Sequence, residues 1–356
     1  MTGGAQSLLI VGNRGGTNVG ESLEDAGRGI VSTELIESRR AMEGPRLLRT
    51  LAWRLGGRRP LRLRAFGDEV AACCRHSRPD VLLATGIAGL DSTALQQVGE
   101  LGVQRVLFVT DDPWNPAHRA RWFLKTLPLY DRIFTTKRAT VADLQAGSAS
   151  EVSFLPFAYD PRFWHASAAE MEADPTGTAD PLDSDVMFAG GADADRVPYI
   201  AALTAAGLRV ALFGDYWYRF PATRSLTRGQ TDAETVRRAA LKTKVALCMV
   251  RRANRDGHAM RTFELPASGA CMLTEFTEEH CEIFGEEGRA VLYFRSIAEM
   301  VEKAAWLIAN AEERRRLARS AHDLITRGGH TYRDRMLTIL NTLSTPRQTP
   351  ARDCVA

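Results

Sequence analysis

The sequence predicts an α/β protein with two doubly wound parallel sheets. Short apolar runs rich in Val, Ile, Leu and Phe recur along the chain and are bounded by Gly or Asp, which is typical of buried parallel strands. Helical patterns lie between these runs. The chain also has 356 residues, more than one domain of ordinary size, so we expect two domains.

The first half of the chain contains four predicted strands, at 7–12, 80–86, 105–112 and 131–136. Helical stretches are predicted between them, for example at 91–101 and 137–146. The first residues, MTGGAQSLLIVG, lack the charged region and cleavage site of a signal peptide and are predicted to lead into the first strand. Residues 1–164 therefore form the predicted N-terminal, Rossmann-like domain.

A polar segment at 165–184 interrupts this rhythm and is predicted to be a linker. The alternation then resumes, with strands predicted at 185–191, 209–215, 244–250, 271–276 and 290–294. Helices are predicted at 196–206, from about 261, and in a tail from 297 to about 343. We expect a C-terminal domain at 185–343, a flexible tail at 344–356, and a ligand cleft between the two domains.

Composition excludes several classes of protein. Apolar residues make up 45% and charged residues 25%, values of a soluble globular protein. The net charge of +3 and pI of about 8.6 are too balanced for a dedicated nucleic-acid binder. No apolar run is long enough to span a membrane. The six cysteines have no metal-type spacing, so we predict reduced thiols, a cytoplasmic location, and no metal or cofactor.

The most informative motif lies at 254–269 and contains Asp256, Gly257, Arg261 and Glu264. A loop that enters a helix offers unpaired amides to a phosphate, and Arg261 can add a charge-assisted hydrogen bond. A carboxylate one turn further suits the two hydroxyls of a ribose. The alternative is a solvated helix start with a surface Arg–Glu pair.

The stretch RTFELPASGACMLTE resembles the donor-binding helix of the group 1 glycosyltransferases, which have the GT-B fold. More narrowly, it is similar to the branch of spore-maturation CgeB-like proteins, which has an Arg, two residues, a Glu, then Pro-Ala-x-Gly and an apolar strand ending in an acid. A turn at 284–287 (one residue out of register), the stretch 311–318 and the ending at 330–335 also resemble that branch. The resemblance covers nearly the whole chain and is densest at 185–335.

The resemblance implies two Rossmann-like domains that face a cleft, with a C-terminal helical tail. It implies a nucleotide-diphosphate sugar on the C-terminal domain, an acceptor on the N-terminal domain and no metal ion. Carried over from the family, Asp256 contacts the donor sugar and Glu264 contacts the ribose. The wider family has Glu at the first position, so the reach of Asp256 is shorter by one methylene. His258 lies inside the motif and is a candidate phosphate contact.

A glycine-rich turn in the second half of the chain is a further candidate for the donor site. Gly190 and Gly191 follow the first strand of the second half and allow close backbone approach to a ligand. Arg196 is a candidate diphosphate clamp, or else a surface helix residue. Asp193 and Asp195 resemble the metal-binding pair of the other large glycosyltransferase fold, but a GT-B enzyme uses cations and helix dipoles instead.

Gly15 and Gly16 follow the first strand of the chain, in a turn that is neither a P-loop nor GxGxxG. In the similar enzymes this turn lies across the cleft from the donor phosphates. The alternative is a flexible turn.

Asp111 and Asp112 are candidate catalytic bases because they lie at the end of a predicted buried strand, where ligands of α/β proteins bind, and His118, six residues further, is a second candidate. An inverting transfer needs such a base, whereas in a retaining transfer the leaving phosphate can take the proton. Adjacent strand positions point in opposite directions, so the sequence leaves open which aspartate faces the cleft. The alternatives are a helix cap for the aspartates and a surface position for His118.

Residues 39–64 contain nine arginines interleaved with Leu47, Leu48, Leu51, Trp53 and Leu55. This pattern predicts a basic amphipathic helix followed by a loop. Such a helix can dock on anionic lipid or on an acidic acceptor. A solvated, Arg-rich face is the alternative.

Together these patterns predict a metal-independent glycosyltransferase that binds a nucleotide sugar and does not bind nucleic acid. The acceptor is open among glycan, lipid, small molecule and protein, and peripheral membrane contact through 39–64 is left open. One alternative is a catalytically silent assembly or binding protein of the same fold. The other is a sugar-nucleotide epimerase. Donor base, donor sugar, stereochemical outcome and oligomeric state are not predicted.

Overall fold

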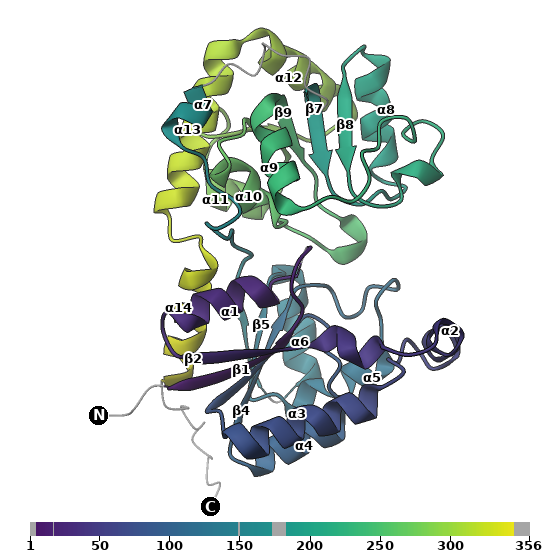
Figure 1. The fold of residues 1–356 in the computed structure, drawn as a ribbon. Coiled ribbons are helices and arrows are strands. Elements are labelled where there is room, and N and C mark those ends of the chain that lie inside the picture. Colours follow the sequence, from purple (N-terminus) through teal and green to yellow (C-terminus); the bar gives the residue numbers. More distant parts are fainter. Residues whose placement is uncertain (1–4, 17, 149, 173–182, 345–356) are drawn as a thin grey trace, which may run out of the picture.

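A computed structural model of the chain describes residues 5–16, 18–148, 150–172 and 183–344. Figure 1 shows two α/β domains, one above the other, each built around its own parallel sheet. The predicted α/β class with two doubly wound domains is confirmed.

The N-terminal sheet has six parallel strands in the order β2-β1-β3-β4-β5-β6. Its strands are β1 Ser7–Gly12, β2 Ser32–Glu37, β3 Val81–Thr85, β4 Gln104–Val109, β5 Arg132–Thr135 and β6 Glu151–Phe154. Its helices are α1 Gly20–Arg28, α2 Arg46–Leu55, α3 Leu63–Ser77, α4 Ser92–Glu100, α5 Arg121–Leu124 and α6 Val141–Gly147. The four strands predicted in this half are all present.

The C-terminal sheet has five parallel strands in the order β11-β10-β9-β7-β8. Its strands are β7 Ser184–Ala189, β8 Val210–Phe213, β9 Thr243–Cys248, β10 Met272–Glu275 and β11 Leu292–Phe294. Its helices are α8 Val197–Ala205, α9 Ala233–Lys242, α10 Arg261–Ala267, α11 Glu278–Phe284, α12 Ile297–Ala309 and α13 Ala311–Arg327. All five predicted strands of this half are present as well.

Two strands of the first domain have no counterpart in the sequence prediction. β2 pairs only with β1, and β6 pairs only with β5, so both lie at edges of the sheet. An edge strand is less covered by neighbouring elements than a central strand, so part of its side chains can be polar. The edge strands STELIE and EVSF accordingly lack the continuous apolar run of a central strand. The central strands could be recognised in the sequence because burial on both faces gives them continuous apolar runs.

The chain crosses between the domains twice, and the two crossing segments run side by side. The backbone N–H of Tyr159 donates to the carbonyl of His330 at 3.0 Å, and the N–H of Tyr332 donates to the carbonyl of Tyr159 at 3.2 Å. The buried guanidinium of Arg335 donates to the carbonyl of Phe157 at 3.0 Å. These hydrogen bonds fix the start of the last helix against the first crossing segment.

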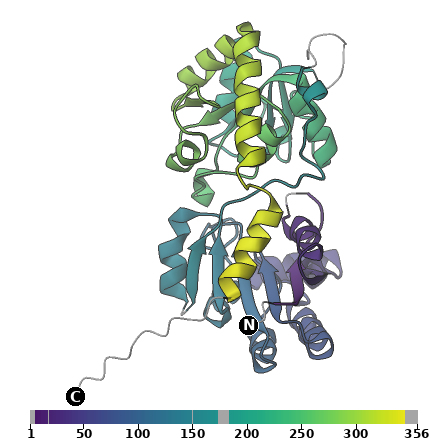
Figure 2. The same ribbon diagram turned by 90° about the vertical axis from the view of Figure 1, so that its left-hand side faces the viewer.

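That last helix, α14 (Tyr332–Ser344), lies on the N-terminal domain and packs against α1. Figure 2 shows it continuing downward from α13 across the boundary between the domains. The sequence prediction assigned these residues to the C-terminal domain. In the structure the helical tail therefore ties the two domains together.

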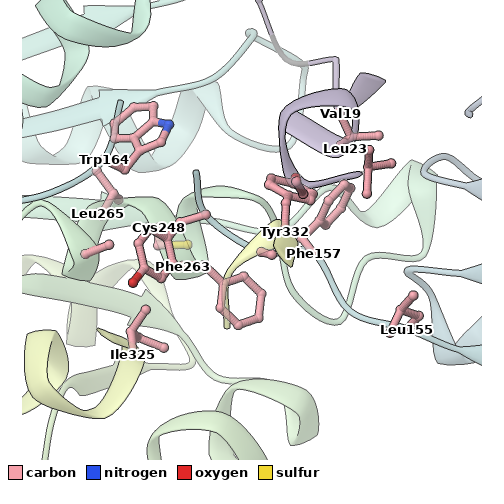
Figure 3. Close-up of a cluster of buried hydrophobic side chains, with 14 of the residues drawn as sticks. Val19, Leu23, Leu155, Phe157, Trp164, Cys248, Phe263, Leu265, Ile325 and Tyr332 are labelled. Atoms are coloured by element: carbon pink, nitrogen blue, oxygen red, sulfur yellow. The ribbon is translucent and has the colours of Figure 1, made fainter. Parts of the chain in front are cut away.

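A continuous apolar cluster fills the region where the crossing segments meet both domains. Figure 3 shows Phe157, Phe263 and Tyr332 close together within it, with Trp164 and Leu265 on the side of the C-terminal domain. Because these side chains come from both halves of the chain, one apolar core supports both walls of the interdomain region.

The predicted linker at 165–184 contains a short helix, α7 (Ala168–Glu172), and its residues 173–182 lie outside the described part of the chain. The predicted flexible tail lies outside it too, except for Ser344. Among the described residues, no helix has both the length and the apolarity needed to cross a bilayer.

Candidate active site

A cleft of about 940 Å³ lies between the carboxyl ends of the two sheets. Residues that follow β1, β4 and β5 line its N-terminal wall, and residues that follow β7, β8 and β9 line its C-terminal wall. The carboxyl ends of parallel strands are the usual place for ligands in α/β proteins. The predicted interdomain cleft is therefore present where the fold leads one to expect it.

The turn at Gly190 and Gly191, which follows β7, packs tightly against surrounding backbone and aromatic rings. A Cβ on Gly190 would lie 2.9 Å from the ring of Phe188, and a Cβ on Gly214 would lie 2.5 Å from the carbonyl oxygen of Gly190. The indole N–H of Trp217 donates to that same carbonyl at 2.8 Å. The turn is thus held by backbone and aromatic contacts, and both Gly190 and Gly191 line the cleft.

Arg196 lies beneath this turn and is largely buried. Its two terminal nitrogens donate to the carbonyls of Gly191 and Met249, each at 3.0 Å. Its Nε, which is buried, has no hydrogen-bond partner within the described residues. That Nε lies 3.7 Å from a carboxylate oxygen of Asp193, so two carbonyls and an ion pair hold the guanidinium. Arg196 lines the cleft at the place predicted for the diphosphate.

The nearby acids Asp193 and Asp195 lie in the turn before α8. The carboxylate of Asp193 accepts from the backbone N–H of Asp195 at 3.1 Å and of Arg196 at 2.9 Å, and so holds that turn. Arg251, which lines the cleft, lies 3.6 Å from the same carboxylate. The geometry thus gives Asp193 a structural role.

Arg261, at the start of α10, reaches from the donor motif toward the first turn. Its Nε donates to the carbonyl of Ala189 at 3.3 Å, and its guanidinium lies 4.9 Å from the centre of the Trp164 ring. It also pairs with Glu264, three residues further along α10. Arg261 lines the cleft and is held from three sides, which suits a group that must present a fixed positive charge.

Glu264 lies behind Arg261 and does not line the cleft. Its carboxylate is buried, and burial raises the pKa of Glu264 while the adjacent Arg261 opposes that rise. The predicted ribose contact would have to reach Glu264 past the guanidinium. In the structure, the visible role of Glu264 is to hold Arg261.

Asp256 is the centre of a polar network that joins the two domains. Lys137, two residues after the end of β5, forms an ion pair with Asp256. The side-chain amide of Asn254 donates to Asp256 at 3.0 Å and to Asp111 at 3.2 Å. Asp111, Lys137, Asn254 and Asp256 all line the cleft. Two acids from opposite walls are thus bridged by one amide.

The structure separates the two adjacent aspartates. Asp111 lines the cleft, whereas Asp112 is bound by the guanidinium of Arg255 at 2.7 and 3.0 Å. Asp112 also caps the turn that follows, because it accepts from the N–H of Trp114 at 2.9 Å. It lines a different pocket, of about 610 Å³. Of the pair, only Asp111 is placed to act as a base in the cleft.

Besides Glu264 and Asp112, three more predicted site residues do not line the cleft. His118 lies in the turn after Asp112, with its N–H donating to the carbonyl of Asn115 at 2.8 Å. A Cβ on Gly257 would lie 2.2 Å from the carboxyl carbon of Glu279, so this glycine is needed for packing. His258 is buried and contacts Glu279 and the first crossing segment instead of the cleft.

His258 acts as a connector because of its hydrogen bonds. Its Nε2 accepts from the backbone N–H of Phe157 at 3.0 Å, so the ring proton lies on Nδ1, where it is donated to Glu279. Burial lowers the pKa of His258, which favours this neutral form. His258 thereby holds the donor loop to the crossing segment.

The N-terminal wall is shaped by the turn after β1. Gly15 and Gly16 have φ of +71° and +62°, values that favour glycine, and both line the cleft. The backbone N–H of Arg39 donates to the side chain of Asn13 at 2.7 Å, and Arg39 donates to the carbonyl of Arg14 at 2.8 Å. These contacts add two arginines to the edge of the cleft.

Several cleft residues were absent from the sequence prediction: Lys137, Asn254, Arg251, Arg14 and Arg39. Lys137 carried a usable signal, because it follows a predicted buried strand as Asp111 does. Asn254 is the first residue of the predicted motif at 254–269, and Arg251 precedes that motif by three residues. Arg14 directly precedes the predicted turn at Gly15 and Gly16, and Arg39 is the first arginine of the basic segment 39–64, but neither was predicted to line the cleft.

A buried histidine near the donor motif leads to a pH prediction. His280 donates from Nδ1 to the carbonyl of Glu275 at 2.7 Å, Thr262 lies 2.9 Å from its Nε2, and burial lowers its pKa to about 4. In the unfolded chain this histidine binds a proton near pH 6.5, whereas in the folded chain it binds one only near pH 4. The free energy of unfolding therefore decreases as the pH is lowered from about 6.5 to 4. We expect His280 to lower the free energy of unfolding by about 2 kcal/mol between pH 7 and pH 5.

Urea unfolding at both pH values, on the wild type and on His280→Gln, measures this contribution. The pH difference in unfolding free energy should shrink by about 2 kcal/mol in the variant. His76→Gln, at an exposed position on α3, is the matched control and should keep the wild-type difference. An unchanged difference in His280→Gln would contradict the prediction.

Comparison with known proteins identifies the fold. Residues 196–341 match a protein-family model described as glycosyl transferase-like. Sucrose-phosphate synthase from Thermosynechococcus elongatus has 12% identity and a TM-score of 0.65, over 95% of this chain and 98% of that chain. Anabaena Alr3699/HepE in complex with UDP and glucose has 11% identity and a TM-score of 0.62, over 96% of this chain and 100% of that chain.

A third solved structure, a UDP-forming α,α-trehalose-phosphate synthase from Burkholderia xenovorans, has 12% identity and a TM-score of 0.62, over 96% of this chain and 100% of that chain. No curated protein sequence matches this chain. At these identities the likeness shows the fold alone, which is the predicted GT-B fold. The narrower resemblance to CgeB-like proteins stays a prediction.

Proposed function

We propose that this protein is a glycosyltransferase that transfers a sugar from a nucleotide-diphosphate sugar to an acceptor hydroxyl without a metal ion. One observation carries the proposal: arginines and glycine turns line one wall of the cleft, and Asp111 faces them from the other. The family model that matches 196–341 supports it, as do similar folds solved with UDP or UDP-glucose.

The diphosphate would lie against the turn after β7 and the start of α10. Arg196, Arg251 and Arg261 all line the cleft here. Carbonyl oxygens and the carboxylate of Asp193 hold their positive charges in position. Negative charge grows on the diphosphate as the sugar bond breaks. Fixed cations that face that charge lower the barrier, because they need no reorganisation during the reaction.

The sugar would then lie between the diphosphate and the acceptor, close to the Asp256 network. We propose that Asp256 contacts a sugar hydroxyl, as the resemblance implies. The carboxylate of Asp256 already accepts a hydrogen bond from Asn254 and forms an ion pair with Lys137, so its orientation is set before the donor binds. Asp111 would accept the acceptor proton in an inverting transfer, whereas the leaving diphosphate would accept it in a retaining one.

A panel of sugar nucleotides tests the proposed function. Purified protein is titrated with each donor by calorimetry in EDTA, and nucleotide release is followed with and without candidate acceptors. We expect at least one donor to bind and to turn over without a divalent ion. Binding without turnover across a broad acceptor panel would favour the silent binding protein, and conversion of the donor sugar without any acceptor would favour the epimerase. The absence of binding across the panel would contradict the proposal.

A further inference from the structure

The helix α2 (Arg46–Leu55) buries none of its residues, although four of its ten residues are leucine. Leu47 and Leu55 are 72% and 82% exposed, and Leu48 and Leu51 are exposed as well. In a soluble protein, a helix normally buries its apolar stripe against the core. Figure 1 shows α2 standing out from the N-terminal domain, away from the sheet. The apolar side chains of this helix therefore have no covering element within the described residues.

The leucines gather on one side of the helix. At about 100° per residue, Leu47, Leu48, Leu51 and Leu55 fall within roughly a third of the circumference. Arg46, Arg49 and Arg54 fall outside that stripe, on either side of Trp53. We call Leu47, Leu48, Leu51 and Leu55 the leucine face. A helix with an apolar face and a basic remainder is the kind that lies in the interface of a membrane.

The charge around α2 is of one sign. The segment 44–64 contains seven arginines and no acidic residue. Within the described residues, no carboxylate pairs with Arg46, Arg49 or Arg54. A surface that combines exposed leucines with unpaired arginines matches a partner that is both anionic and apolar below its surface.

The base of α2 is anchored to the domain, so the helix has a defined orientation. The indole N–H of Trp122 donates to the carbonyl of Arg58 at 3.0 Å, and Arg58 donates to the carbonyl of Arg119 at 3.0 Å. On the other side, a 3-10 helix at Ser38–Met42 leads into α2 and contains Arg39, which lines the cleft. The exposed helix is thus joined directly to the edge of the cleft.

From these observations we propose that α2 docks this protein on an anionic lipid bilayer, with the leucine face inserted among the lipids and the arginines at the level of the phosphates. A bilayer fits better than a folded protein, because the leucines lie on a projecting helix and not in a groove. Docking by α2 depends only on this surface and is independent of the proposed transferase reaction. It would bring the cleft edge at Arg39 close to the membrane.

Vesicle sedimentation of the full chain tests this proposal, with phosphatidylglycerol–phosphatidylcholine vesicles compared with pure phosphatidylcholine. We expect binding to the anionic vesicles only, weakened by raising the salt concentration. Two triple variants separate the two components, Leu47→Gln/Leu51→Gln/Leu55→Gln and Arg46→Gln/Arg49→Gln/Arg54→Gln. Glutamine is a good helix former, so both keep the helix. Each should weaken vesicle binding at least about tenfold.

A matched control removes three exposed arginines far from α2 in the sequence, Arg224→Gln/Arg238→Gln/Arg319→Gln, and thus the same charge. It should bind anionic vesicles as the wild type does. The proposal is overturned if the wild type does not bind anionic vesicles, or if this control loses as much binding as the α2 variants. It is also overturned if the leucine variant binds unchanged, or if the wild type is a dimer that the leucine substitutions dissociate.

Discussion

Replacing Asp256 by alanine is expected to lower the free energy of unfolding by about 3–5 kcal/mol. Its partner Lys137 is only 1% exposed, and Asp256 itself is 10% exposed. Without the carboxylate, the ammonium group is left buried and uncompensated between the two domains. Removal of one member of a buried ion pair is far more costly than the net worth of the pair, because the remaining charge still pays for its lost hydration.

Chemical unfolding of single and double variants measures this effect. Lys137→Met combined with Asp256→Ala removes both charges, and it should recover a large part of the loss seen in Asp256→Ala alone. The matched control is Glu282→Ala, which breaks an exposed interdomain pair with Arg138 and should cost less than about 1 kcal/mol. A loss below about 1 kcal/mol in Asp256→Ala, without recovery in the double variant, would contradict the buried pair.

Replacing Arg261 by alanine is expected to reduce turnover about 10²- to 10³-fold, as for other fixed donors that stabilise transition-state charge. Donor binding should weaken by about 1–3 kcal/mol, the usual worth of a charged hydrogen bond. Glu264 is left buried in this variant. Because burial already raises the pKa of Glu264, the carboxyl can respond by binding a proton, and we expect the fold to survive.

Glu264→Ala should have a related effect on binding, for a different reason. The guanidinium of Arg261 loses one of its three contacts and is less fixed in the cleft, so donor binding should weaken by about 1–3 kcal/mol. Calorimetric donor titration and initial-rate kinetics measure both variants. The control is Arg252→Ala, which lies on the preceding loop, pairs with Glu275 and does not line the cleft. Unchanged donor affinity in both Arg261→Ala and Glu264→Ala would mean that the donor motif is misplaced.

The sequence predicted best those strands that are buried on both faces of their sheet. Runs such as LLIV in β1 and VLLAT in β3 are apolar at successive positions because neighbouring strands and helices cover both faces, so their pattern could be recognised. β2 is a polar edge strand and carries no such pattern. The direction of α14 was also unpredictable, since an amphipathic helix does not reveal which domain its apolar face will contact.

In the candidate site, too, some residues could be predicted from the sequence and others could not. The glycine turn at Gly190 and the motif at Arg261 could be predicted because their residue types are tied to backbone approach and charge. The choice between Asp111 and Asp112 could not, since it depends on Arg255, which lies 143 residues away and binds Asp112. Lys137 was missed for a similar reason, because its role arises only when the loop that carries Asp256 packs against β5.

The structure of a complex with the donor's nucleoside diphosphate, prepared in EDTA, tests the central claim most directly. The account predicts the diphosphate against the turn at Gly190 and Gly191, within hydrogen-bond distance of Arg196 or Arg261, with no metal ion beside it. A diphosphate bound elsewhere in the molecule, or one that binds only when a divalent ion is restored, would contradict the account.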